Sequence, residues 1–108
     1  MSSKLQDQLL RERFELLHKL VGKPVVVKLP HYPGHRRVAY AWRVFGYSSA
    51  LGPTYDPSKI GPGCAVGLML TDFNERGEPY PEAHARCLVV FDYDGSAIAN
   101  VTPVVFHE

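Results

Sequence analysis

The sequence has few of the residues that identify a chemical class at sight. It holds only two cysteines, Cys64 and Cys87, and their spacing matches no zinc-binding pattern. Its formal net charge is +1 over 108 residues, so it has no bulk attraction for nucleic acid. Its longest apolar stretches, 65–70 and 87–91, are far too short to span a bilayer. We therefore expect no zinc site and no membrane-spanning helix.

The cysteines and the first residues both bear on the compartment. Lys4, Asp7 and Arg11 interrupt the N-terminal segment, which therefore lacks the apolar centre of a secretory signal. We accordingly expect a cytoplasmic protein in which both cysteines are reduced. Cys87 lies in a nearly all-apolar segment, so we expect it to be a small core residue.

Length and composition predict one globular domain covering residues 1–108. Apolar residues make up 45% of the chain, enough for one core. Nine glycines and nine prolines favour turns between short strands over a helical bundle. Residues 1–46 carry nine basic against three acidic side chains, and residues 47–108 carry three against eight. This asymmetry fits a basic face or head-to-tail self-association, unless the halves interleave and cancel.

Residues 1–22 have the pattern of an amphipathic helix. Ser3 and Gln6 form a capping box, and Gly22 followed by Pro24 ends the helix near Val21. Two apolar stripes run along it, formed by Leu5, Leu9, Leu16 and Leu20 and by Leu10, Phe14, Leu17 and Val21. Together they cover more of the circumference than one sheet face needs. The helix either touches a partner as well as its own sheet or lies deep in its own domain.

Residues 23–108 predict a β body of five short antiparallel strands. The alternating or continuous apolar segments that predict them are 25–29, 37–47, 64–71, 85–91 and 97–106. The fourth is nearly all apolar, which favours a central position, whereas Pro103 favours an edge for the fifth. Residues 48–63 contain Gly-Pro, Asp-Pro and Gly-Pro-Gly, so we expect a long loop that is functional or mobile.

The order of these elements and several local patterns resemble a known family. The helix end runs into the first strand, Trp42 and Phe45 supply apolar positions in the second, and Gly95 precedes Ile98 and Val101 by three and six positions. The pattern at the helix end consists of Leu17, Leu20, Gly22, Val25, Val27 and Leu29. These residues resemble the Sm-like (LSm/Hfq) family. The resemblance implies an α+β fold with an N-terminal helix and a five-stranded antiparallel small barrel of Sm-like or SH3-like type.

The resemblance also implies a ring-shaped homo-oligomer with RNA as a partner, but the chain departs from the family where a base would be read. The family's aspartate and asparagine after the second strand fall on Gly46 and Ala50, whose side chains cannot hydrogen-bond a base edge. Any nucleic-acid binding should therefore be weak and indifferent to sequence. The main alternative architecture is a helix packed on an open antiparallel sheet, as in cystatin-like proteins.

The turn between the first two predicted strands combines basic side chains with an aromatic ring. His35, Arg36 and Arg37 can contact phosphates, and Tyr32 can stack on an unpaired base. This group is our candidate site for RNA or single-stranded nucleic acid. The competing interpretation is a solvated hairpin tip. His31 and His35 could share a metal only with a third ligand from elsewhere, so we predict no metal or other cofactor.

An aromatic face provides the alternative site. Tyr40 and Trp42 recur at strand spacing, and Tyr55 in the loop 48–63 could lie above them. Such a face would bind a small ligand or another protein. Packing of Trp42 in the core is the competing interpretation.

No set of residues meets the geometric requirements of catalysis. His84 and Cys87 would point to opposite faces of a regular strand, and Asp92 and Asp94 belong to a solvated turn. We therefore expect a non-catalytic, oligomeric interaction module rather than an enzyme.

Overall fold

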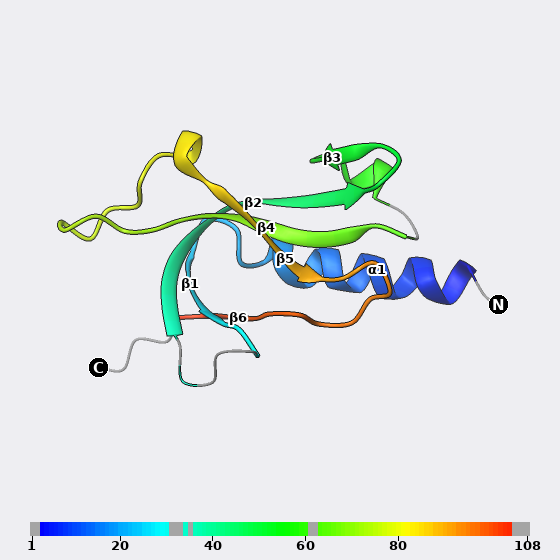
Figure 1. Ribbon diagram of the computed structural model, residues 1–108, viewed down its shortest axis with the longest axis horizontal. Coiled ribbons are helices and arrows are strands. Elements are labelled where there is room, and N and C mark those ends of the chain that lie inside the picture. The colour runs from blue at the N-terminus through cyan, green and yellow to red at the C-terminus, as the bar shows by residue number, and fades with distance from the viewer. Residues whose placement is uncertain (1–2, 31–33, 35, 61–62, 105–108) are drawn as a thin grey trace.

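The computed structural model describes residues 3–30, 34, 36–60 and 63–104, with side chains from residue 8 onward. Its fold is α+β, with one N-terminal helix and a six-stranded antiparallel sheet (Figure 1). The elements in chain order are α1 (Ser3–His18), β1 (Pro24–Lys28), β2 (Arg36–Ser48), β3 (Gly52–Thr54), η1 (Pro57–Lys59), β4 (Ala65–Thr71), η2 (Glu82–His84), β5 (Arg86–Phe91) and β6 (Asn100–Pro103). The five predicted strands are present, and the short β3 is a sixth.

Helix α1 packs one apolar stripe on the sheet and exposes part of the other, whose last member, Leu20, follows the helix and is buried in the core. Leu10 and Leu17 are buried in the core, and Phe14 packs beside them. Leu9 and Leu16 keep exposed fractions of 45% and 55%. The helix is therefore not sunk fully into its own domain, because these two leucines still face solvent.

The chain leaves α1 through a turn at Gly22. This residue has φ of +82°, a left-handed conformation that favours glycine, and its N–H donates to the carbonyl oxygen of Ala41 over 2.7 Å. The predicted role of Gly22 is confirmed, although the helix itself ends at His18, before Val21. Three residues named in the helix prediction have side chains outside the described part of the structure: Ser3, Leu5 and Gln6.

The sheet has the strand order β5-β4-β2-β1-β6, and β3 pairs the second half of β2. Because β1 pairs both β2 and β6, the last strand returns to the first. No pairing between β5 and β6 is seen among the described residues, so the sheet is open and a closed barrel is not shown. Strand β6 lies at an edge, as Pro103 predicted.

The predicted central position of the fourth strand is wrong, because β5 is the other edge of the sheet. The strand is apolar not because it is central but because side chains on both of its faces pack against other parts of the protein. Leu88 and Val90 face the core, while Phe91 lies under the guanidinium group of Arg13 from α1, 5.3 Å from ring centre to Cζ. Both faces of β5 are thus partly covered. Its outer edge pairs only at its end, where the N–H of Ile98 donates to the carbonyl oxygen of Val90 over 2.9 Å.

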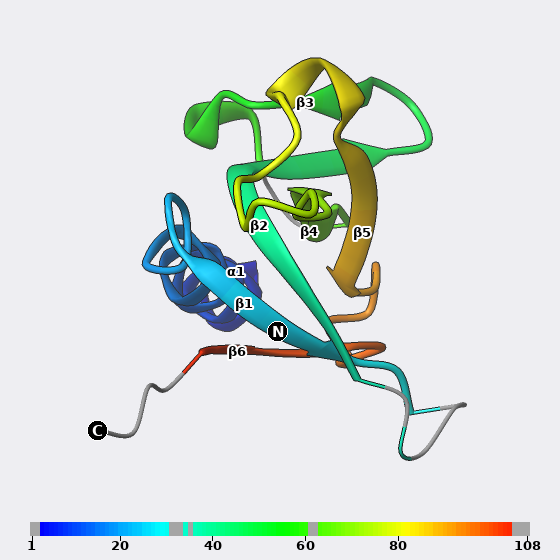
Figure 2. The same ribbon diagram turned by 90° about the vertical axis from the view of Figure 1, so that its left-hand side faces the viewer.

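Strand β2 is bent, and the bend shapes the sheet. A register shift between Ala41 and Arg43 marks a β-bulge opposite β4. Before it, β2 pairs β1, and beyond it the same strand pairs β3 (Figure 2). The resulting concave face packs against α1 around a core that includes Leu17, Val25, Ala41, Val44, Val66, Leu68 and Val90.

The segment 48–63 is not the irregular loop that its glycines and prolines predicted. Strand β3 and the 3-10 turn η1 both lie in it. Asp56 caps η1 by accepting from the backbone N–H of Ser58 over 3.0 Å. Ile60 then packs against the core. The error arose because β3 is only three residues long and its pairing with β2 has no local sequence signature.

The basic and acidic halves of the chain interleave. Arg37 forms an ion pair with Asp72, and Arg43 lies 3.9 Å from Glu82. Each pair joins the first half of the chain to the second. Part of the charge asymmetry is therefore cancelled locally, as one of the interpretations of the sequence anticipated.

Candidate functional site

The structure describes half of the predicted basic turn. Tyr32 and His35 lie outside the described residues, as does His31. Arg36 and Arg37 are the first two residues of β2, and both are exposed. Because they are neighbours on a strand, their side chains point to opposite faces of the sheet. The two arginines therefore belong to different surfaces.

Arg37 faces the concave side and is held by Asp72. Its Nε donates to Asp72 Oδ1 over 2.8 Å, and its Nη2 donates to Oδ2, which makes a two-pronged ion pair. These hydrogen bonds from Arg37 lower the pKa of the Asp72 carboxyl and raise the pKa of the guanidinium. With its charge matched in this way, Arg37 is a weaker phosphate ligand than the sequence suggested.

Arg36 faces the outer side and stands opposite Lys28 of β1 in the strand register. Both side chains are exposed. Two like charges directly across an antiparallel pair repel each other, so an anion placed between them would relieve that repulsion. We call this pair, Lys28 and Arg36, the basic spot. The sequence alone could not identify Lys28 as part of it, because the register was needed.

Aromatic rings continue the same outer face of β2. Tyr40 lies edge-to-face with Trp42, with 4.8 Å between ring centres, and also with Phe73 at 6.3 Å. The indole N–H of Trp42 donates to the hydroxyl of Thr71 over 2.8 Å. All three rings are partly buried rather than enclosed in the core. Phe73 was missed from the sequence because it follows β4 in a segment that predicts only a turn.

The third member of the predicted aromatic face, Tyr55, has different neighbours. Its ring lies under the guanidinium group of Arg43, 4.8 Å from centre to Cζ. It shares a hollow with Phe14 and His18 of α1, and neither Tyr40 nor Trp42 lines that hollow. The structure therefore brings Tyr40 and Trp42 together and places Tyr55 with a separate group.

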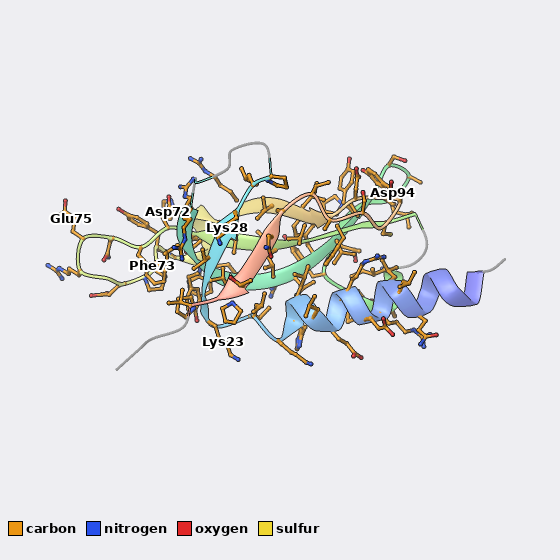
Figure 3. The ribbon with its side chains drawn as sticks, turned by 90° about the horizontal axis from the view of Figure 1, so that it is seen from below. Lys23, Lys28, Asp72, Phe73, Glu75 and Asp94 are labelled. Carbon is orange, nitrogen blue, oxygen red and sulfur yellow. The ribbon has the colours of Figure 1, made fainter. Side chains whose placement is uncertain are left out.

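The acidic turn 92–95 lies at the opposite end of the molecule. Figure 3 shows Lys28, Asp72 and Phe73 at one end and Asp94 at the other, on the side of the N-terminal half of α1. The N–H of Gly95 donates to the carbonyl oxygen of Asp92 over 2.8 Å, and Asp94 accepts from both the hydroxyl and the backbone N–H of Ser96. Those bonds lower the pKa of Asp94. The Asp92 carboxylate accepts from the backbone N–H of Tyr93 over 2.8 Å, so both carboxylates serve the turn that the sequence predicted.

The two cysteines lie in different environments. Cys64 is buried and Cys87 is exposed, and both are free thiols. The prediction that Cys87 is a core residue is therefore wrong, because it alternates outward between Arg86 and the inward-facing Leu88 on an edge strand. Within the described part of the chain, no three His, Cys, Asp or Glu side chains are grouped closely enough to hold a metal ion.

Comparison with protein-family models, with curated proteins and with solved structures finds no match for this chain. Among the described residues, no helix has the length and apolar character needed to cross a membrane. The features of the molecule that bear on function are the basic spot, the aromatic rings, the exposed leucines of α1 and the edges of the sheet.

Proposed function

We propose that this chain is a non-catalytic, homo-oligomeric interaction module that binds RNA or other single-stranded nucleic acid weakly and without sequence preference. The observation that carries the proposal is the outer face of β1 and β2, which holds the basic spot and, four residues further along β2, Tyr40 with the rings of Trp42 and Phe73. A strand of nucleic acid needs cations for its phosphates and flat apolar surfaces for its unstacked bases. This face offers both within one hairpin and the segment beside it.

The two arginines should contribute unequally to such binding. Arg36 is exposed on the same face as the aromatic rings, whereas Arg37 faces the other way and is paired with Asp72. Arg36 and Lys28 would therefore supply most of the electrostatic attraction for bound phosphates. The absence of a base-reading carboxylate or amide at Gly46 and Ala50 supports binding that does not distinguish bases.

Fluorescence anisotropy with labelled oligo-U, oligo-A and single-stranded DNA tests this proposal. We expect similar affinities for all three, because phosphates and ring faces are common to them. If the basic spot neutralises two phosphates, raising salt from about 50 to 200 mM should weaken binding about sevenfold through counterion release. Tight, salt-resistant binding to oligo-U alone would contradict sequence indifference.

Matched variants distinguish the contributions of the two faces of β2 to nucleic-acid binding. Arg36→Ala should weaken binding strongly and reduce the salt dependence, since one phosphate contact is lost. Arg37→Ala should have a smaller effect, and Arg76→Ala, in the exposed turn after β4, should have none. No binding of any oligonucleotide at low salt, or equal losses for all three variants, would refute nucleic-acid binding through this face.

Self-association has its own structural support. Leu9 and Leu16 leave an apolar stripe of α1 in solvent. Strand β6 is one edge of the sheet, and β5 is the other, paired only at its end with the segment before β6. Exposed apolar stripes and unpaired edges are surfaces on which proteins associate. We expect a stable homo-oligomer at tens of micromolar, measured by light scattering after size-exclusion chromatography.

A charge placed in the exposed stripe should shift that equilibrium. Leu16→Glu should favour smaller species if α1 lies in the interface, whereas Gln8→Glu adds the same charge to the same helix outside the stripe. A clean monomer for the unaltered protein would contradict the proposal. An oligomer that Leu16→Glu leaves intact would instead point to the strand edges.

We further propose that the fold is a divergent, opened form of the Sm-like small barrel and that the protein is cytoplasmic. The return of β6 to β1 supports the first point, because a sheet that folds back on its first strand needs only one more pairing to close. Two free thiols support the second.

A further inference from the structure

A groove opens on the concave face of the sheet where the core ends. Val27, Ala39, Leu70 and Leu88 line it, one from each of β1, β2, β4 and β5. In Figure 2, the first half of β2 and the strand β5 lie on either side of β4. The groove has a volume of about 230 Å³. That is roughly the space seven or eight waters occupy in the liquid, so it fits the apolar part of a small molecule.

Three charged residues stand at the mouth of this groove: Arg37, Asp72 and Arg86. Each is two positions along the chain from an apolar residue that lines the groove. Because side chains alternate along a strand, each of the three lies on the face of the sheet that carries the groove and the core. Charged side chains usually lie on the solvent-facing side instead. The mouth is charged because the core stops there and water begins.

The charges at the mouth do not cancel. Arg37 and Asp72 satisfy each other through two hydrogen bonds. Arg86 forms no ion pair with any carboxylate among the described residues, although its charge adds to the effect of Arg37 in lowering the pKa of Asp72. The mouth thus carries one net positive charge, that of the Arg86 guanidinium, which lies on the same face of the sheet as the apolar groove.

We propose that this groove binds a small monocarboxylate with a short apolar chain. The chain occupies the space among Val27, Ala39, Leu70 and Leu88, and the carboxylate accepts hydrogen bonds from Arg86. A guanidinium fork matches the two oxygens of a carboxylate, so one residue both binds and orients the head group. This site is independent of the outer face assigned to nucleic acid.

The charge balance selects a carboxylate over other head groups. A dianionic phosphate would bring a second negative charge close to Asp72, which already neutralises Arg37. An amine would face the uncompensated Arg86. A neutral amide would lose the charge-assisted hydrogen bond, which is about twice as strong as its neutral counterpart. A polymer is excluded as the main occupant by the size of the groove.

Binding of hexanoate, followed by amide shifts in a two-dimensional NMR titration up to millimolar concentrations, tests the proposal. We expect saturable shifts centred on Leu70, Arg86 and Leu88. Hexanamide has the same apolar chain without the charge and should bind about tenfold more weakly. Hexyl phosphate should also bind more weakly than hexanoate. Equal shifts with hexanoate and hexanamide would overturn the role given to charge.

A pair of variants locates the carboxylate. Arg86→Gln removes the charge from an exposed side chain and should weaken hexanoate binding about tenfold without disturbing the fold. Arg76→Gln removes the same charge from the exposed turn after β4 and should leave binding unchanged. Unaltered hexanoate affinity in Arg86→Gln, shifts confined to other residues, or no shifts at all would overturn the proposal.

Discussion

Gly67 lies where β4 and β5 approach too closely for any side chain. A Cβ placed there would stand 2.1 Å from the carbonyl oxygen of Leu88, whereas the nearest atoms to one placed at Gly46 belong to the side chain of Ile60, 2.7 Å away at its Cγ1. Backbone cannot move aside as a flexible side chain can. Gly67→Ala should therefore lower the free energy of unfolding by about 3 kcal/mol or more, and Gly46→Ala by about 1 to 2 kcal/mol. Urea denaturation of the two variants makes the comparison, and equal losses would contradict it.

The ion pair between Arg37 and Asp72 should make stability depend on pH. Because Arg37 lowers the pKa of Asp72 in the folded protein, the pair stabilises above about pH 4 and this contribution is lost as pH falls through the lowered pKa. Both side chains are about half exposed, so Asp72→Asn should cost no more than about 1 kcal/mol at pH 6. The difference from the unaltered protein should shrink below pH 4. Glu75→Gln is the control, and a cost that does not vary with pH would argue against the pair.

At the scale of elements, α1 offers neighbouring leucines with opposite environments. Leu17 is 1% exposed, and Leu16 is 55% exposed. Leu17→Ala leaves a cavity in the core and should lower the free energy of unfolding by about 2 to 5 kcal/mol. Leu16→Ala should change it by less than about 0.5 kcal/mol when measured at concentrations where the chain is monomeric. Thermal and urea unfolding check both, and a large cost for Leu16 would mean that its surface is covered.

The same scale shows what could be predicted from the sequence. Helix α1, the turn at Gly22 and the longer strands follow from local periodicity and local turn residues, so they were predictable. The edge position of β5, the pairing of β3 and the contact of Arg37 with Asp72 depend on register between distant segments. Periodicity carries no information about register. In the candidate site, Arg36 could be predicted because it is a basic residue in a basic turn. Lys28 and Phe73 could be identified only from the folded structure, which gives the strand register and the ring contacts.

For the molecule as a whole, the two thiols report on how the fold opens. Cys87 is exposed on an edge strand, and Cys64 is 7% exposed beside the core. A thiol reagent should therefore modify Cys87 rapidly and Cys64 only at the rate at which the core opens. Cys87→Ser should remove the fast phase and keep the slow one. Two equally fast phases would mean that the region around Cys64 is open in solution.

The pairing of β1 with β6 has a consequence during synthesis. Lys28 of β1 stands opposite Asn100 of β6, so about 70 more residues must be translated after β1 before its partner strand β6 exists. At ribosomal rates of about 5 to 20 residues per second, β1 waits roughly 4 to 14 seconds for that partner. Once β2 has been translated it can pair one edge of β1, but the other edge of this valine-rich strand stays unpaired until β6 is made. The period of greatest risk of mispairing with another polypeptide therefore lasts until the last strand docks.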